Sequence, residues 1–195
     1  MQSDLFRALL ITGPPGVGKT TLVRRICSKL GEKGHSLQGF YTEEVREAGN
    51  GQRIGFDVVT LSGERGVLAR SINVGETDKR RPKVGKYWVY VQDFEDLALP
   101  QLEIKDDGEK PGLLVIDEVG KMEMFSKRFE TTVDNLLEKK LIPLVITIPE
   151  KSSLRLVEQL RKSPKSMLFQ VTKSNRDSLA KKIADLITKS MLVTK

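Results

Sequence analysis

The sequence predicts an α/β protein in which a mostly parallel sheet is covered by helices on both faces, in three layers, with an inserted β-meander. Two observations carry this prediction. Short apolar runs of strand type alternate along the chain with segments whose apolar residues recur at helical spacing. A glycine-rich segment instead alternates with period two, which is typical of antiparallel strands. Buried strands separated by helices favour a parallel sheet with both faces covered.

The elements of the α/β part follow in chain order. The first strand is predicted at residues 8–11, where an apolar run ends at a glycine and two prolines. The helix after it closes at Gly31 and Gly34, and later strands are predicted at residues 113–116, 144–146 and 167–169. The helical apolar faces are Leu22, Val23, Ile26 and Leu30; Phe125, Phe129, Val133, Leu136 and Leu137; Leu154, Val157 and Leu160; and Leu179, Ile183, Leu186 and Ile187.

The segment from about residue 39 to residue 91 is predicted as a β-meander inserted after the first helix or the second strand. Ile54, Phe56 and Val58 point to one side of a strand, and the Ala-Gly-Asn-Gly run at residues 48–51 is a hairpin turn signal. A second turn is expected at residues 62–66 and a third strand at residues 87–91. The insertion is too small to be an independent unit, so we expect a single domain over residues 1–195.

A glycine-rich loop follows the first predicted strand and fits the pattern G-x-x-x-x-G-K-[ST]. Such a loop turns backbone N–H groups inward around phosphates, and larger side chains would block that approach. Its lysine reaches the β- and γ-phosphates, its threonine hydroxyl ligates Mg²⁺, and the next helix directs its positive end at the same anions. We therefore predict a nucleoside-triphosphate site made by Gly13, Pro14, Pro15, Gly16, Val17, Gly18, Lys19 and Thr20.

Two acidic residues directly follow the apolar run at residues 113–116. Asp117 ends that strand at the edge where open α/β sheets bind ligands, so it can hold the magnesium shell together with Thr20. Glu118 is predicted to polarise the attacking water, because phosphoryl transfer depends mainly on positioning. A kinase would exclude water, so this residue favours hydrolysis. Glu118 and Lys19 are the expected catalytic residues.

Weaker candidates keep two interpretations each. Thr147 could sense the γ-phosphate or cap a turn, and Lys121 and Glu123 could touch the transition state or line a loop. Asn175 and Arg176 could lie near the base, although Asn175 is favoured as a helix N-cap. One arginine could act as an arginine finger, and the sequence does not distinguish among Arg46, Arg53, Arg70, Arg80 and Arg81.

Composition limits the remaining classes of function. The net charge is +7, but the basic residues are spread out without interleaved aromatics, so nucleic acid is not expected as the main substrate. Cys27 and His35 are the only residues of their types, which excludes an internal disulfide, a cysteine-built zinc site and a multi-histidine metal centre. Without an apolar run of about 18 residues or a signal peptide, we expect no membrane association. The expected form is a cytoplasmic monomer, with a nuclear pool left open.

Six stretches cover nearly the whole chain in order: GPPGVGKTTL at 13–22, GFYTEEVR at 39–46, RIGFDVVTLSG at 53–63, FEDLALP at 94–100, IDEVGKME at 116–123 and VTKSNR at 171–176. Together they resemble the cancer-related nucleoside-triphosphatase family, which is also described from thermophilic microbes. The hairpin segment and the Asp-Glu-x-Gly-Lys-Met-Glu run are more specific than the phosphate loop, which many families share. The loops at residues 75–83 and 105–110 follow no family pattern.

The resemblance implies a RecA-like P-loop NTPase fold. It also implies slow, magnesium-dependent hydrolysis of several nucleoside triphosphates (ATP, GTP, CTP, UTP and TTP) to diphosphates, with low base selectivity. Besides the phosphate loop, the family's nucleotide-binding positions match Leu113, Leu114, Val115, Ile116, Asp117, Glu118, Val119 and Gly120.

Two alternatives remain open. One is a small nucleotide or nucleoside kinase, but such kinases usually have an arginine-bearing lid and a helical insert, whereas the insert predicted here is a β-meander. The other is a regulatory or nucleic-acid-linked ATPase. The intact set of Lys19, Thr20, Asp117 and Glu118 argues against a module that only binds nucleotide.

Overall fold

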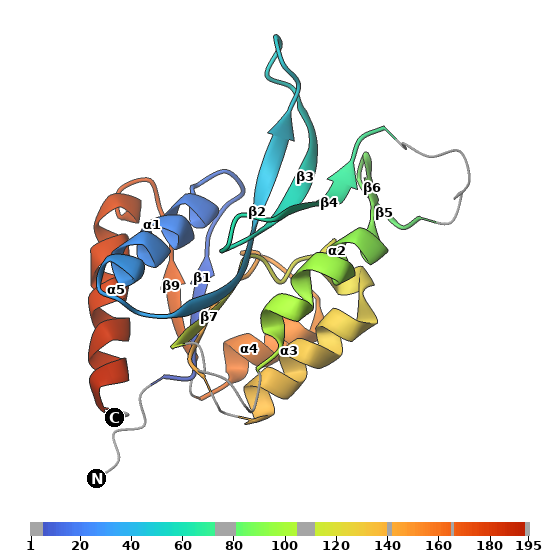
Figure 1. Cartoon of the computed structure of the whole chain (residues 1–195). Helices are drawn as coiled ribbons and strands as arrows, with labels where there is room; N and C mark the ends of the chain where they lie inside the picture. Colours follow the sequence, from blue (N-terminus) through green and yellow to red (C-terminus); the bar gives the residue numbers. More distant parts are fainter. Residues whose placement is uncertain (1–5, 73–80, 105–111, 140–141, 165, 194–195) are drawn as a thin grey trace.

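A computed structural model describes residues 6–72, 81–104, 112–139, 142–164 and 166–193. The strands are β1 (Ala8–Thr12), β2 (Leu37–Arg46), β3 (Arg53–Thr60), β4 (Arg65–Arg70), β5 (Lys83–Val84), β6 (Tyr87–Val89), β7 (Leu113–Ile116), β8 (Leu144–Thr147) and β9 (Ser166–Gln170). Over the described residues they form one sheet in the order β5-β6-β4-β3-β2-β7-β8-β1-β9 (Figure 1). The predicted α/β architecture is confirmed.

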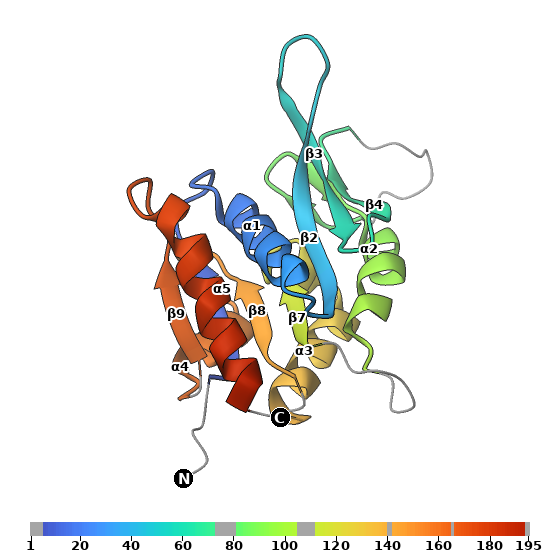
Figure 2. The ribbon, with the colours of Figure 1, turned by 60° about the vertical axis from the view of Figure 1, so that its left-hand side comes forward.

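Helices cover both faces of the sheet. Figure 2 shows α1 (Lys19–Glu32) and α5 (Arg176–Val193) together on one face, and α2 (Val91–Ala98), α3 (Lys127–Lys139) and α4 (Arg155–Lys162) lie on the other. Strand β1, which lies between β8 and β9, is buried on both sides: Leu9 and Ile11 pack with the α1 and α5 cluster, and Ala8 and Leu10 pack with the opposite cluster. No helix in the described part of the chain is both long and apolar enough to span a membrane.

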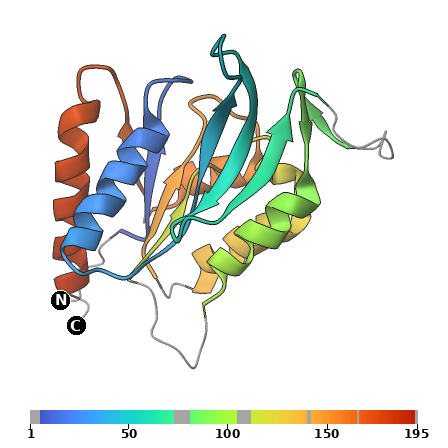
Figure 3. The ribbon, with the colours of Figure 1, turned by 45° about the horizontal axis from the view of Figure 1, so that its top comes forward.

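The β-meander follows α1, as predicted, and its strands continue the main sheet. Residues 37–40 of β2 pair in parallel with β7, and residues 40–46 of the same strand pair antiparallel with β3. The sheet is therefore mixed, with the strands from β2 to β9 parallel and those from β2 to β5 antiparallel. The β2–β3 hairpin projects beyond the ends of the parallel strands (Figures 1 and 3).

Several local expectations are corrected by the structure. Phe125 belongs to a 3₁₀ turn at Glu123–Phe125 and is 41% exposed. The reason is that Ser126 Oγ accepts a hydrogen bond from Phe129 N at 2.9 Å, which caps α3 after Phe125. The third meander strand ends at Val89, because residues 91–98 form the unpredicted helix α2.

Candidate active site

The loop between β1 and α1 has the backbone geometry that a phosphate site requires. Gly13, Gly16 and Gly18 have φ values of +153°, +74° and +106°. A Cβ on Gly13 would also lie 2.7 Å from the carbonyl oxygen of Val171, so this position has no room for a side chain. Gly18 precedes α1 without a side-chain cap, which leaves the first N–H groups of the helix available to an anion.

Lys19 lies over this loop. Its Nζ donates to the carbonyl oxygen of Gly13 at 3.0 Å and to that of Pro14 at 3.5 Å. The ammonium group is thus held at the mouth of the loop, where the outer phosphates of a bound triphosphate are expected.

Asp117 ends β7 beside the loop and is 1% exposed. Thr147 on the neighbouring strand β8 donates its hydroxyl to Asp117 Oδ1, whereas Oδ2 is buried without a hydrogen-bond partner. Burial raises the pKa of Asp117, although Thr147, Thr20 and Lys19 act in the opposite direction. The Asp117 carboxylate therefore keeps one buried oxygen without a hydrogen-bond partner, and the Thr20 hydroxyl lies close enough to this carboxylate to lower its pKa.

These groups fit a divalent cation. A magnesium ion prefers oxygen ligands, and the unpaired Oδ2 of Asp117 would gain the partner that it lacks. The described residues contain no group of three or more His, Cys, Asp or Glu side chains that could hold a metal by themselves. Magnesium at this place would therefore take its remaining ligands from phosphate and water.

Two carboxylates, those of Glu118 and Glu123, flank Gly120. Glu118 lines the cleft; burial and then the charge of Asp117 raise its pKa, and Lys19 lowers it. Glu123 is 4% exposed, and its Oε2 accepts a hydrogen bond from Gly120 N at 3.1 Å. A Cβ on Gly120 would lie 2.7 Å from Glu118 Oε1 and 2.9 Å from Glu123 Oε2, so both carboxylates approach the same point of the backbone.

We expect Glu123 to make folding stability dependent on pH. Burial and then the charge of Glu118 raise its pKa to about 8, compared with 4.5 for an ordinary glutamate. The folded state binds this proton more tightly than the unfolded state, so the free energy of unfolding falls as the pH rises from about 5 to about 8. Glu123→Gln keeps an acceptor for Gly120 N but cannot ionise, so it should remove the contribution of Glu123 to that fall, on the order of a few kcal/mol.

Urea unfolding of the metal-free protein at pH 5, 7 and 9 measures this effect. Glu138→Gln removes an exposed glutamate of α3 and is the matched control, with the wild-type pH dependence expected. An equally steep loss of stability in Glu123→Gln and in the wild type would contradict the prediction.

A cleft of about 800 Å³ connects the phosphate loop to the hairpin. The loop and Glu118 form one wall, and the hairpin forms another through Thr42, Glu44, Arg46, Arg53 and Phe56. Sequence reasoning did not predict Thr42, Glu44 or Phe56 as site residues. The period-two pattern of β2 puts Thr42, Glu44 and Arg46 on one face, but only the tertiary structure shows that this face borders the phosphate loop.

The weaker candidates separate clearly. Thr147 hydrogen-bonds to Asp117, so its hydroxyl orients that carboxylate and does not cap a turn. Lys121 is exposed, and Arg176 Nη1 donates to the carbonyl oxygen of Val17 at 3.3 Å, behind the phosphate loop.

Asn175 occupies the predicted N-cap position, since it directly precedes α5 and its carbonyl oxygen accepts a hydrogen bond from Leu179 N at 3.0 Å, but the Asn175 side chain does not cap the helix. Its Oδ1 accepts a hydrogen bond from Thr172 N at 2.8 Å and its Nδ2 donates to the carbonyl oxygen of Gln170 at 2.9 Å. The side chain therefore stabilises the loop between β9 and α5. A side-chain cap would instead accept a hydrogen bond from an N–H group in the first turn of α5.

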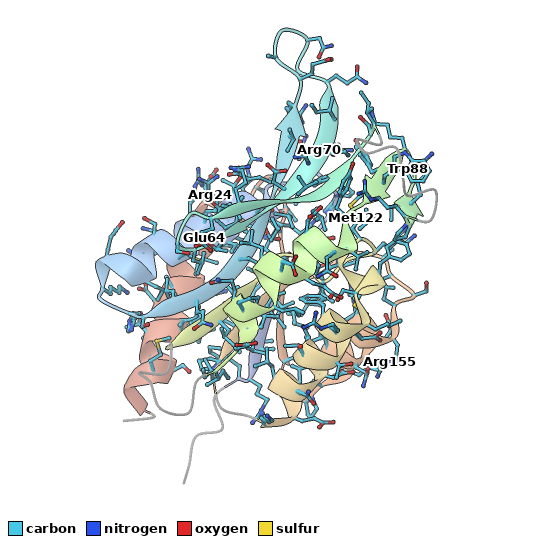
Figure 4. All side chains as sticks on the ribbon, turned by 45° about the vertical axis from the view of Figure 1, so that its right-hand side comes forward. Arg24, Glu64, Arg70, Trp88, Met122 and Arg155 are labelled. Carbon is cyan, nitrogen blue, oxygen red and sulfur yellow. The ribbon has the colours of Figure 1, made fainter. Side chains whose placement is uncertain are left out.

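The structure places the candidate arginines in different surroundings. Arg46 and Arg53 line the cleft. Arg70 is engaged by Asp57 Oδ1 at 2.5 Å and by backbone carbonyls of β3 and β4, and Arg81 lies 4.0 Å from the ring centroid of Tyr90. Figure 4 shows Arg70 on the strand next to the hairpin. Arg80 lies outside the described residues.

Five of the positions implied to bind nucleotide lie in the hydrophobic core. Their side chains are fully buried and pack in the two clusters on either side of the sheet. These residues are Leu113, Leu114, Val115, Ile116 and Val119. The binding role implied for them stays a prediction, and Glu118 is the residue of this segment that lines the cleft.

Comparisons with known proteins identify relatives over most of the chain. Residues 8–184 match a protein family described as NTPase. The chain is 45% identical over 186 residues to the cancer-related nucleoside-triphosphatase of Homo sapiens, covering 93% of this chain and 95% of that protein. It is 39% identical over 184 residues to nucleoside-triphosphatase THEP1 of Aquifex aeolicus (strain VF5), covering 92% and 98%.

Two solved structures share the fold. The solution structure of a human cancer-related nucleoside triphosphatase matches with a TM-score of 0.79 at 44% identity, covering 94% of this chain and 98% of that chain. The crystal structure of THEP1 from the hyperthermophile Aquifex aeolicus matches with a TM-score of 0.77 at 37% identity, covering 92% and 98%. The P-loop fold expected from the motif is thus the fold of these relatives.

Proposed function

Because the chain belongs to the NTPase family, we propose that it hydrolyses nucleoside triphosphates to nucleoside diphosphates and phosphate with the aid of magnesium. The observation that carries this proposal is the Asp117-Glu118 pair at the end of β7, beside the phosphate loop. Asp117 has a free buried oxygen for a cation, and Glu118 faces the cleft in which a water molecule can approach the γ-phosphate.

Each residue has a distinct role in the proposed reaction. The N–H groups of the loop and the ammonium group of Lys19 bind the outer phosphates and neutralise charge that develops on them. Thr20 and Asp117 would hold magnesium, which when bound neutralises phosphate charge and orients the phosphates. Glu118 accepts a hydrogen bond from the attacking water and aligns it with the γ-phosphate.

The proposed substrate range is broad. The names of the relatives specify a nucleoside triphosphate without a base. Phosphates bound by a loop backbone and a lysine are common to ATP, GTP, CTP, UTP and TTP, which supports low base selectivity. We also propose that residues 1–195 act as one domain, since both hydrophobic clusters are built on the same sheet. The monomeric state and the cytoplasmic location stay predictions.

Steady-state phosphate release tests the function. We expect purified protein to release phosphate from each of the five triphosphates with magnesium, and to stop when the metal is chelated. Candidate nucleoside and nucleotide acceptors, DNA and RNA are added separately. Transfer of phosphate to an acceptor in preference to water would favour the kinase alternative. Release that requires DNA or RNA would favour the nucleic-acid-linked ATPase.

Lys19→Ala should weaken triphosphate binding by about tenfold or more, because it removes the cation held over the phosphate loop. Calorimetry with a non-hydrolysable triphosphate analogue measures the affinity. Lys29→Ala is the matched control, since Lys29 is exposed on the same helix, nearly three turns beyond Lys19. Equal affinities for the wild type and Lys19→Ala would contradict the site.

A further inference from the structure

The cleft face of the hairpin carries two arginines directly opposite each other. Arg46 and Arg53 are partners in the register of β2 and β3, and both line the cleft that also contains Lys19 and Glu118. Like charges in opposed positions of a sheet destabilise it unless another group compensates. A pair of cations in this position therefore needs a compensating anion.

Glu44 supplies part of that compensation. Arg46 Nη2 donates to Glu44 Oε2 at 2.5 Å, and Arg53 Nη1 donates to Glu44 Oε1 at 2.7 Å. Burial acts to raise the pKa of Glu44, but the hydrogen bonds from Arg53 and Arg46 lower it overall. Glu44 is therefore a carboxylate at neutral pH, and one carboxylate shared by two guanidinium groups leaves the three side chains with a net positive charge.

Both guanidinium groups are held in place and remain accessible. Arg53 Nε donates to Tyr87 Oη at 3.0 Å, and its guanidinium lies 5.1 Å from the ring centroid of Phe56. Arg46 Nη1 donates to the carbonyl oxygen of Gly51 at 2.9 Å. The side chain of Arg46 is 57% exposed and that of Arg53 is 42% exposed. A guanidinium group has five N–H donors, more than these contacts occupy. Oriented arginines of this kind suit bidentate binding of a phosphoryl group.

We propose that Arg46 and Arg53 form a second phosphoryl-binding subsite across the cleft from the phosphate loop, with Glu44 holding the two arginines when no phosphoryl group is bound. This inference rests on the proposed function and deepens it. The phosphoryl group has two possible sources with the same chemistry: the γ-phosphate of the bound nucleotide, or the phosphate of a second molecule in the cleft. An arginine at the γ-phosphate would stabilise charge in the transition state.

The first arm of the test is kinetic. Arg46→Ala, Arg53→Ala and the double variant are compared with the wild type for kcat and KM. If the γ-phosphate is the ligand, the double variant should lose at least about tenfold in kcat, with KM changed less than about threefold. Arg155→Ala is the matched control, because Arg155 also bridges two carboxylates, Glu130 and Asp134, but lies on α4 away from the hairpin (Figure 4).

The second arm measures binding of inorganic phosphate by calorimetry. With protein saturated by a magnesium nucleoside diphosphate, phosphate can occupy the γ-position. With protein saturated by a non-hydrolysable triphosphate analogue, bound phosphate reports a second molecule. In at least one of these states, the double variant should bind phosphate at least about tenfold more weakly than the wild type and Arg155→Ala.

Glu44→Gln gives a readout that a structural role would not produce. Removing the competing carboxylate charge should tighten phosphate binding several-fold when both arginines are present. It should have no effect in the double variant that lacks Arg46 and Arg53. Arg53→Lys, which keeps the charge, is used if Arg53→Ala lowers the melting temperature, and it should retain more phosphate affinity than Arg53→Ala.

Unchanged kcat together with unchanged phosphate affinity in the double variant would overturn the proposal. So would an equal effect of Glu44→Gln in both backgrounds. The phosphate-binding arm also separates this inference from the proposed function: a wild-type protein without hydrolytic activity would refute hydrolysis, whereas arginine-dependent phosphate binding would still support the subsite.

Discussion

Glu118→Gln is expected to slow hydrolysis by between about 10² and 10⁴, the range typical of a general base. Glutamine has nearly the same shape as glutamate, so nucleotide binding should stay normal, but its amide is a poor acceptor for the proton of the attacking water. Glu118 lines the cleft, and its raised pKa brings it closer to the range in which a carboxylate accepts a proton well. Single-turnover phosphate release and calorimetry measure the two properties separately.

Glu64→Gln is a matched control for this substitution, because Glu64 is exposed in the turn between β3 and β4. Its turnover should equal that of the wild type. A fall of less than about tenfold in Glu118→Gln, equivalent to a barrier increase below about 1.4 kcal/mol, would remove Glu118 from the mechanism. Weaker nucleotide binding with unchanged single-turnover chemistry would assign it to binding instead.

Gly39→Ala is expected to destabilise the fold by about 3 kcal/mol or more. Gly39 has a φ of +130°, a conformation that L side chains rarely adopt, and it pairs with Val115 where β2 lies against β7. A Cβ on Gly39 would lie 2.0 Å from the carbonyl oxygen of Val115. Because the three nearest atoms all belong to the Val115 backbone, the contact can be relieved only by separating the two strands. The same separation would move Thr42 away from Asp117 and weaken the candidate metal site.

Urea unfolding measures this loss, and Gly31→Ala is its control. Gly31 lies in α1 with nothing within 4 Å of an added Cβ, so alanine should stabilise the protein by up to about 1 kcal/mol. Opposite signs for the two glycine substitutions would show that the loss comes from the backbone conformation of Gly39 and its close approach to β7, and not from replacing a glycine as such. A loss below about 1 kcal/mol in Gly39→Ala would mean that the sheet accommodates the methyl group, contrary to this expectation.

Much of the fold could be predicted from the sequence because its signals are local. The buried strands β1, β7 and β8 are short continuous apolar runs, and the apolar face of α1 repeats at helical spacing. The loop at residues 13–20 needs glycines for its own backbone conformation. Helix α2 and the start of α3 after Ser126 were not predicted, since they depend on local hydrogen bonds and packing more than on the spacing of apolar residues.

The sequence by itself determined the phosphate loop and the order of strand, Asp117 and Glu118, because each depends on residues adjacent in the chain. Only the tertiary structure decided what lies around them. Thr147 reaches Asp117 across 30 residues because β7 and β8 are neighbours, and Arg46 and Arg53 border the loop because β2 continues past the end of β7. Such contacts depend on which strands pair and in which register, and no local pattern in the chain encodes that pairing.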